Sequence, residues 1–392
     1  MKKIAIICSG NLNNRKGLVN ACLSRVKFLK SIVKNYSIDV YFIQSRRSHF
    51  FCFLKKIKFE ARCPSSYDIE GMNIRLLWYT STVTDYILYV RLKWRALWEE
   101  FGLNKYVGLF QNYDLVSAHS VPAVDLAYKV YKTYKIPFCV TWHGADIHSF
   151  PFINKYKRKD IIRYIQSAEM NFFVSKTLLE KSRELDDVTS KRYILYNGIG
   201  ENFVCYSQVQ KDYLRKRFLV YNKKVVAFAG SLFVIKNALM LPEIYKRVKD
   251  LYLGNVVFWI IGDGKLRHKI ELLNRKYNLE CKMWGNQPVE VMPDLMNCMD
   301  VLVLPSQNEG LPLVTVEALA CGCNVVGSNV GGISEAIGKE NVVDLGDGFV
   351  EKISLKIVEM LSDPPIQIVP EMFSWEKTAL QEDDFYQKIL NQ

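Results

Sequence analysis

The sequence predicts an α/β protein made of two Rossmann-like domains, each built on a parallel sheet. The chain has 392 residues, which exceeds what one hydrophobic core usually supports, so we expect two domains. It opens with an apolar strand at 2–8, a polar loop and a periodic helix at 18–33. A second unit of strand, helix and strand lies at 300–332. Helices that connect successive strands are typical of parallel sheets.

The overall composition is typical of a folded, globular protein. Hydrophobic residues make up 49% of the chain and charged residues 24%. The ten cysteines include no Cys-x-x-Cys pair and no zinc-type spacing with histidine, so we expect free thiols in a reducing cytosol. No secretory signal precedes the first strand, and no apolar run reaches the roughly 18 residues that span a bilayer. We therefore expect a cytoplasmic protein without a membrane-spanning helix.

The positive charge is concentrated in the first half of the chain. Residues 1–190 carry 30 Lys and Arg against 16 Asp and Glu, whereas residues 191–392 carry 23 against 24. Such an imbalance favours a partner that only the first half meets. No recognised nucleic-acid module is present, so an anionic membrane surface or a phosphate-bearing acceptor is the preferred partner.

The loop after the first strand contains the first candidate backbone site. It offers Gly10 and Gly17 but no Gly-x-Gly-x-x-Gly pattern, so it does not indicate a dinucleotide-binding loop. A plain structural loop and a substrate-binding loop are equally compatible with it. A second strand is expected at 38–44.

The most basic segment follows that strand. Between residues 46 and 62 there are six Lys or Arg against one acid, Glu60, with phenylalanines interleaved. Residues 86–101 add more cations together with Trp94 and Trp98. This combination suits the headgroup region of an anionic membrane. A solvated charged face over ordinary core residues remains the alternative, and tryptophans at this spacing are more often part of a core.

The rest of the first domain is expected to contain these elements: strands at 114–118, 138–141, 171–175 and 193–196, and helices at 123–134 and 176–184. The strand at 138–141 ends in Trp142-His143-Gly144, which makes His143 a candidate at the carboxyl end of a sheet. His143 and His148 resemble a metal pair, but no third ligand is near them in the sequence. His119 follows its own strand and is equally compatible with a site or a core position. The first domain is assigned to 1–200 and the second to 222–370, with a polar linker between them.

The second domain contains the most informative segment, at 300–332. A strand at 301–304 leads into a loop, and a helix is expected from Pro312 to Cys321, followed by Gly322 as a left-handed stop. A further strand is expected at 324–327. Other strands of this domain are expected at 225–229, 256–261 and 282–284.

Two carboxylates flank the start of that helix. Glu309 lies in the loop just before the helix, and Glu317 lies about two turns into the helix. The amides of Gly310, Leu311 and Leu313 are at the helix N-terminus, which favours an anion. Carboxylates beside a phosphate would repel it, so we expect them to accept hydrogen bonds from hydroxyl groups instead. A ligand with both hydroxyls and phosphate indicates a nucleotide sugar.

This segment resembles the retaining glycosyltransferases of family 4, which have the GT-B fold. The likeness is carried by Glu309-Gly-Leu-Pro, Glu317-Ala-Leu-Ala-Cys-Gly, Pro305-Ser306, Gly331-Gly332-Ile-Ser-Glu335 and, in the first half, Thr141-x-His143-Gly-x-Asp146. The resemblance implies two Rossmann-like domains that face each other across a cleft, with a C-terminal helix from Trp375 crossing back to the first domain. It implies that Glu309 lies against the donor sugar, that Glu317 holds the ribose hydroxyls and that His143 lies by the sugar.

The resemblance also implies roles for residues around the other loops. Lys236 would hold the donor diphosphate, and Ser231 stands where the family often has arginine, so the dipole and Lys236 would carry more of that charge. Gly17 would allow a close backbone approach, and Leu311, Pro312 and Leu313 would lie along the phosphates. Turn glycines and one aromatic residue complete the expected donor site: Gly262, Gly264, Trp284 and Gly285. A surface lysine and simple turns are the alternatives.

The expected activity is transfer of a sugar from a nucleotide-diphosphate donor to an acceptor hydroxyl with retention of configuration. Bacterial surface polysaccharide assembly on a lipid-linked acceptor, at the inner face of the cell membrane, is the expected setting. The chain has no Asp-x-Asp, so no metal or other cofactor is expected. The alternatives are a catalytically impaired sugar-nucleotide-binding protein and a GT-B epimerase or phosphorylase.

Overall fold

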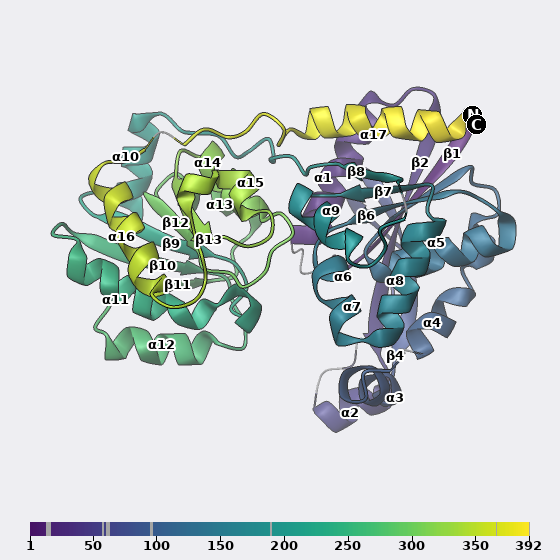
Figure 1. The fold of residues 1–392 in the computed structure, drawn as a ribbon, viewed down its shortest axis with the longest axis horizontal. Coiled ribbons are helices and arrows are strands. Elements are labelled where there is room, and N and C mark those ends of the chain that lie inside the picture. The colour runs from purple at the N-terminus through teal and green to yellow at the C-terminus, as the bar shows by residue number, and fades with distance from the viewer. Residues whose placement is uncertain are drawn as a thin grey trace. The chain divides into compact units, whose positions relative to one another are not determined.

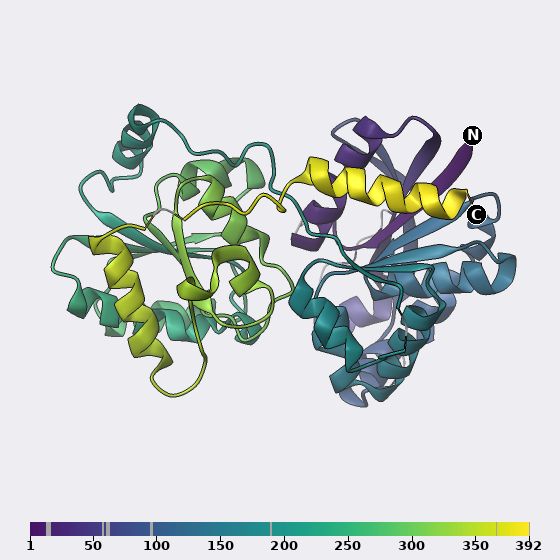
Figure 2. The same cartoon turned by 45° about the horizontal axis from the view of Figure 1, so that its top comes forward.

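The computed structural model divides the chain into two compact units, each described by itself. The first domain comprises Met1–Gly198 with Ser374–Gln392, and the second domain comprises Ile199–Phe373 (Figures 1 and 2). The structure describes residues 1–12, 17–56, 59, 63–94, 97–188, 190–365 and 367–391, except for the side chain of Trp98. That the domains face each other across a cleft stays a prediction.

The first domain is built on an eight-stranded sheet in the order β3-β4-β2-β1-β5-β6-β7-β8. All neighbouring strands are parallel except β3 and β4. The strands are β1 Lys2–Ser9, β2 Tyr36–Arg47, β3 Ser66–Ile69, β4 Met72–Ser81, β5 Leu115–His119, β6 Phe138–Trp142, β7 Met170–Phe173 and β8 Arg192–Ile194. The helices are α1 Gly17–Ile32, α2 His49–Lys55, α3 Val83–Asp85, the π-helix η1 Tyr86–Arg91, α4 Leu97–Asn104, the 3-10 turn η2 Val107–Phe110, α5 Val121–Tyr134, α6 Ala145–His148, α7 Phe150–Ile153, α8 Lys155–Ser167, α9 Lys176–Arg183 and α17 Trp375–Leu390.

Both faces of this sheet are covered, which explains why its central strands are continuous apolar runs. The side chains of Ile4, Ile6 and Cys8 in β1 belong to a core that includes residues of α1 and α17. Helix α5 packs against β1 and β5. Because each strand is buried on both sides, the apolar segments of the sequence located β1, β2, β5 and β6 within a few residues.

An edge hairpin, β3 and β4, was not predicted from the sequence. Its turn consists of Glu70 and Gly71, both with positive φ, 53° and 74°, as a tight two-residue hairpin requires. Within β4 the buried residues Met72 and Ile74 alternate with exposed residues. This alternation is the sequence signal of a half-buried strand.

The C-terminal helix α17 packs on the first domain, as the resemblance implied. It lies beside α1 (yellow in Figures 1 and 2). Glu382 of α17 and Arg25 of α1 form a buried ion pair with 3.5 Å between Nη1 and Oε2, and both side chains are almost wholly buried. Tyr386 donates a hydrogen bond of 2.7 Å to Ser117 in β5. The helix is therefore fixed to the sheet of the first domain by polar contacts inside an apolar core.

The second domain is built on a six-stranded parallel sheet in the order β11-β10-β9-β12-β13-β14. The strands are β9 Lys224–Ala229, β10 Val256–Ile261, β11 Cys281–Gly285, β12 Val301–Leu304, β13 Asn324–Ser328 and β14 Val342–Val343. The helices are α10 Gln208–Arg217, η3 Val234–Lys236, η4 Ala238–Met240, α11 Leu241–Leu251, α12 Arg267–Lys276, η5 Val289–Val291, α13 Met292–Met296, α14 Leu313–Ala320, α15 Ile333–Ile337, η6 Lys339–Asn341 and α16 Phe349–Ser362. Helices α11, α12 and α16 share one core with the sheet, and α13, α14 and α15 lie on the side opposite α11 and α12 (Figure 1).

The segment that the sequence assigned to a linker contains helix α10. Ser207 caps this helix, and Ser207 and Gln210 form a capping box. Arg215 then donates a hydrogen bond of 2.7 Å to the carbonyl of Cys298 and approaches Asp300 to 3.3 Å. The polar composition of the segment therefore reflects a helix that is attached to the second domain by its charged side chains.

Among the described residues, no helix is both long enough and apolar enough to cross a bilayer.

Candidate functional site

The loops at the carboxyl edge of the second sheet are joined to one another by backbone hydrogen bonds. The amide of Gly230, after β9, donates to Ile261 at the end of β10 over 2.9 Å. The amide of Gly262, after β10, donates to Gly285 at the end of β11 over 2.7 Å. The amide of Gln307, after β12, donates to a carbonyl in the loop after β9. A parallel α/β sheet binds ligands at this edge, and here the edge is a connected surface of backbone.

Glu309 is the central side chain of this edge. It lies in the loop between β12 and α14 and is 8% exposed. Lys236, from the loop after β9, places its ammonium 2.5 Å and 2.7 Å from the two carboxylate oxygens. Ser306 donates a third hydrogen bond of 2.7 Å to Oε1. A buried carboxylate needs such partners to remain charged.

The sequence predicts separate roles for Glu309 at the sugar and for Lys236 at the phosphate, whereas the structure joins the two side chains in an ion pair. The structure also adds Ser306 as a partner of Glu309. The pairing has a simple electrostatic consequence. Because Lys236 neutralises Glu309, an anion that approaches this edge does not meet an uncompensated negative charge.

The N-terminus of α14 presents free backbone donors. The amides of Gly310, Leu311 and Leu313 donate no hydrogen bond to any other residue that the structure describes. Pro312 is the N-cap, with φ −78° and ψ 99°, and the helix begins at Leu313 rather than at Pro312 as expected. The difference arises because the extended ψ of Pro312 places it just outside the helix. The predicted stop at Gly322 is confirmed by its φ of 80°.

Glu317 lies on α14 in a partly buried position and has no described hydrogen-bond or ion-pair partner. Desolvation raises the pKa of its carboxyl to about 7. A carboxyl without a protein partner in a desolvated position is available to accept hydrogen bonds from a ligand's hydroxyl groups.

Glycines at this edge allow backbone segments to approach one another closely. Gly262 has a φ of 123°, and a Cβ there would lie 2.0 Å from the carbonyl oxygen of Gly230. A Cβ on Gly331, with a φ of 54°, would lie 1.9 Å from the carbonyl oxygen of Glu309. Gly264 packs in the same way against Leu232, at 2.4 Å. Packing between loops accounts for these glycines, so their presence does not by itself indicate contact with a ligand.

The other selected residues of the second domain have mixed surroundings. Ser231 accepts a hydrogen bond through its carbonyl, and its hydroxyl has no partner in the described part of the chain. The ring of Trp284 packs against Phe218, at 5.5 Å between centroids, and the ammonium of Lys282 lies 3.6 Å from its centre. Gly285 has a φ of 68° and uses its carbonyl to bind Gly262. Trp284 is thus part of an aromatic cluster.

At the carboxyl edge of the first sheet, His143 follows β6 and His119 ends β5. Nε2 of His143 and Nδ1 of His119 are 3.1 Å apart. Asp146 accepts hydrogen bonds from the amides of His143 and Gly144, at 3.2 Å and 2.8 Å, which fixes the loop. Burial and nearby Arg25 lower the pKa of His143 to about 3, so its imidazole is neutral. From the sequence alone His119 is equally compatible with a site or a core position, and the structure places it beside His143.

The remaining candidate, Gly17, is the first residue of α1. Residues 13–16, including Lys16, lie outside the described residues, as do 57–58, 60–62 and 95–96 of the basic segments. Within the described ranges, no group of three or more His, Cys, Asp or Glu is arranged to hold a metal ion. Metal independence stays a prediction.

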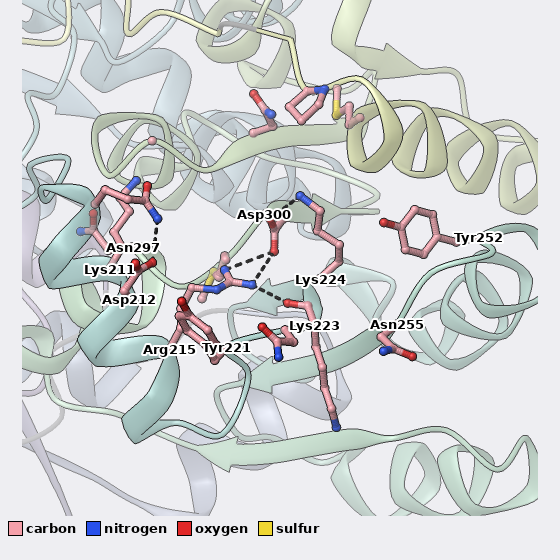
Figure 3. Close-up of a pocket in the computed structure, with 17 residues that line it drawn as sticks. Lys211, Asp212, Arg215, Tyr221, Lys223, Lys224, Tyr252, Asn255, Asn297 and Asp300 are labelled. Carbon is pink, nitrogen blue, oxygen red and sulfur yellow. Dashed lines mark hydrogen bonds and ion pairs between the residues drawn. The ribbon is translucent and has the colours of Figure 1, made fainter.

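A separate polar hollow of about 710 Å³ lies at the opposite, amino-terminal edge of the second sheet (Figure 3). Asp300, just before β12, is bound there by Lys224 at 3.1 Å and Arg215 at 3.3 Å, and by the amide of Val225 at 2.8 Å. These charges are used to attach α10 and β9 to each other. We therefore assign the hollow a structural role and keep the site at the carboxyl edge.

The combination of paired carboxylate, free amides and accessible carboxyl defines the chemistry of the carboxyl edge. Free amides at a helix start and an ammonium stabilise an anion such as a phosphate. Carboxylates accept hydrogen bonds from hydroxyls. The two features together fit a ligand that carries both groups.

The chain has the GT-B fold. A crystal structure of Anabaena HepE in complex with UDP and glucose superimposes with a TM-score of 0.73, at 16% identity, and covers 98% of this chain and 99% of that chain. At this identity the likeness establishes the fold.

Residues 209–373 match the family model described as glycosyl transferases group 1. A putative teichuronic acid biosynthesis glycosyltransferase, TuaC of Bacillus subtilis (strain 168), is 30% identical over 58% of this chain and 56% of its own length. The UDP-Gal:alpha-D-GlcNAc-diphosphoundecaprenol alpha-1,3-galactosyltransferase of Escherichia coli is 28% identical over 57% of this chain and 59% of its own. These two matches span a little over half of each relative. The second domain, Ile199–Phe373, thus matches the group 1 glycosyltransferase model over nearly its whole length.

The raised pKa of Glu317 predicts a pH-dependent contribution to stability. Because the folded pKa of about 7 exceeds the ordinary value of about 4.3, the folded protein binds more protons than the unfolded chain between these values. The wild type therefore loses stability through this group as pH rises from about 4.3 to 7, and no further above 7. We expect Glu317→Gln to gain stability relative to wild type between pH 5 and pH 8, measured by urea unfolding.

The control for this experiment is Glu351→Gln. Hydrogen bonds from Arg247 lower the pKa of Glu351, so stability depends on the ionisation of Glu351 only below about pH 4.3. We expect Glu351→Gln to change the free energy of unfolding by the same amount at pH 5 and at pH 8. A Glu317→Gln effect that is also the same at both pH values would contradict the assigned pKa.

Proposed function

We propose that the whole protein transfers a sugar from a nucleotide-diphosphate donor to an acceptor hydroxyl. The observation that supports this most directly is the arrangement of Glu309, Lys236 and the amides at the start of α14, within the domain that matches the group 1 family model. The diphosphate binds at the amides of Leu311 and Leu313 and at Lys236. The sugar lies against Glu309, and Glu317 accepts hydrogen bonds from the ribose hydroxyls.

This arrangement favours the transition state of glycosyl transfer. As the bond to the phosphate breaks, positive charge develops on the sugar and negative charge on the departing diphosphate. Glu309 stabilises the former, and Lys236 with the helix amides stabilises the latter. Lys236 has three protons and is 26% exposed, so it can bind phosphate while it keeps its bond to Glu309. Ser231 adds a hydroxyl donor in place of a charged side chain.

We propose that the donor is a UDP-sugar and that no metal is needed. Support for uridine comes from the names of two similar proteins: HepE was crystallised with UDP, and the Escherichia coli relative is named for UDP-Gal. Support for metal independence is the absence of Asp-x-Asp from the sequence and the presence of Lys236 for the phosphate charge.

We propose that the anomeric configuration is retained, through attack on the face that the diphosphate leaves. The resemblance of the Glu309 and Glu317 motifs to family 4 supports this. The carboxylate oxygens of Glu309 are bound by Lys236 and Ser306, so Glu309 is not placed as a free nucleophile. The configuration at the anomeric carbon of the product would distinguish retention from inversion.

We propose a lipid-linked acceptor in surface polysaccharide assembly, reached at an anionic membrane. The names of the Bacillus subtilis and Escherichia coli relatives, with teichuronic acid and diphosphoundecaprenol, support this setting. In the first domain the apolar–basic surface, which we define as α2, η1, residues 92–94, α7 and the start of α8, provides physical support. Its exposed apolar residues are Phe50, Phe53, Leu54, Ile87, Val90, Leu92, Trp94, Phe152 and Ile153.

The parts of the apolar–basic surface are in contact with one another. The ring of Phe51 in α2 lies 6.0 Å from that of Tyr86 in η1, and Asn154 donates a hydrogen bond of 2.8 Å to the carbonyl of Trp94. Figure 1 shows α2 and α3 together at one end of the first domain. Residues 46–56, 86–94 and 150–159 contain no Asp or Glu. A surface with exposed phenylalanines, many cations and no acids is complementary to anionic lipid headgroups.

Substitution of the paired charges should abolish most turnover. We expect Lys236→Ala and Glu309→Ala each to lower turnover by about 10²- to 10³-fold, because each removes stabilisation of charge that develops in the transition state. Turnover is measured as release of nucleoside diphosphate from a panel of nucleotide sugars with a lipid extract as acceptor, and circular dichroism checks folding. Lys224→Ala is the matched control, since Lys224 pairs with Asp300 at the opposite edge of the same sheet. Full activity in both site variants would overturn the assignment.

Removal of charge or apolar area from α2 should weaken membrane binding. Each cation near an anionic surface contributes about 1 kcal/mol, so we expect Lys55→Glu with Lys56→Glu to lower binding to phosphatidylglycerol vesicles by at least about tenfold in sedimentation. We expect Phe50→Ser with Phe53→Ser to weaken it as well.

Matched controls for these variants lie on α10 of the second domain. Lys216→Glu with Arg217→Glu and Val209→Ser with Tyr213→Ser change the same kinds of exposed residue and should leave binding unchanged. Equal losses in the α2 and α10 variants, or wild-type binding that is no stronger to anionic than to neutral vesicles, would exclude this surface as the docking site.

A further inference from the structure

The two histidines at the carboxyl edge of the first sheet form a hydrogen-bonded pair. Nδ1 of His119 is 3.1 Å from Nε2 of His143, within hydrogen-bond distance. His119 is fully buried, whereas His143 is partly exposed. Since one nitrogen must donate and the other accept, the position of one proton decides the hydrogen-bonding character of both rings.

Both rings are uncharged at neutral pH. Burial lowers the pKa of His119 well below its ordinary value, and the neighbouring His143 and Arg25 lower it further. Burial and Arg25 act in the same direction on His143. Each neutral ring therefore carries a single N–H.

The surroundings of His119 decide which nitrogen carries that proton. Its Nε2 is buried and has no hydrogen-bond partner in the described part of the chain. A buried N–H without an acceptor is rarer and more costly than a buried acceptor without a donor. The proton of His119 is therefore favoured on Nδ1, from which it is donated to Nε2 of His143.

We infer that His119 is a positioning residue that holds His143 in its Nδ1–H tautomer, so that His143 presents an N–H donor to an oxygen atom of the ligand. Nε2 of His143 is occupied as an acceptor, which leaves its Nδ1 as the nitrogen without a described partner. That this oxygen belongs to the donor sugar or to the acceptor rests on the proposed function. The assignment of the tautomer does not depend on the proposed function.

The loop that carries His143 is suited to this task. Asp146 binds the amides of His143 and Gly144, so the backbone beneath the ring is fixed. A free neutral imidazole prefers its proton on Nε2, and His119 reverses that preference. A fixed backbone and a fixed tautomer together preorganise a donor, which a single flexible histidine would not do.

The test is the tautomer of His143 in the intact protein, read from long-range nitrogen–proton correlations of protein with ¹⁵N-labelled histidine. The chain has five histidines, and the signal of His143 is assigned by its loss in His143→Gln. We expect the Nδ1–H pattern in the wild type, and a shift toward Nε2–H in His119→Leu. His268→Leu, the same change in the second domain, should leave the pattern of His143 unaltered.

An Nε2–H pattern for His143 in the wild type would overturn the inference even if His119→Leu does not fold. An unchanged Nδ1–H pattern in a folded His119→Leu would overturn it as well. Neither outcome depends on donor turnover, so failure of this inference is distinguishable from failure of the proposed glycosyl transfer.

Discussion

The charge of Glu309 and its neutralisation by Lys236 are the constraint on which the second domain's site depends. A carboxylate that is 8% exposed must be paired and hydrogen-bonded. Lys236 and Ser306 meet that requirement from different loops. The pair therefore joins the loops after β9 and β12, and it places one ammonium where an anion at the start of α14 can also reach it. The same contact stabilises the loops and prepares the electrostatics of the site.

The sequence predicted the parts of this arrangement that follow from local rules. Continuous apolar runs located the parallel strands, and Gly322 marked the end of α14. It did not predict that Lys236 and Glu309 bind each other, because they are 73 residues apart and their contact depends on how β9 and β12 pair in the sheet. The capping box at Ser207 and the alternation in β4 were readable signals. Neither element was predicted, because the segments that contain these signals lie among polar or basic residues.

The first domain differs in kind from the second. Its candidate residues are neutral and hydrogen-bonded to each other, as in the pair of His119 and His143, whereas the second domain uses charges and free amides. Under the proposed function, the first domain would offer directional hydrogen bonds to a hydroxyl of the donor sugar or of the acceptor, and the second would stabilise the diphosphate. Glycosyl transfer requires both contributions, the orientation of the reacting groups and the stabilisation of developing charge.

The most direct measurement for the account is a crystal structure of the full chain with UDP, accompanied by soaks with GDP and ADP. The account predicts the diphosphate at the amides of Leu311 and Leu313 and within reach of Lys236, with the ribose hydroxyls at Glu317. A nucleotide bound instead at the amino-terminal edge beside Asp300, or one bound with Glu309 and Glu317 away from it, would contradict the account.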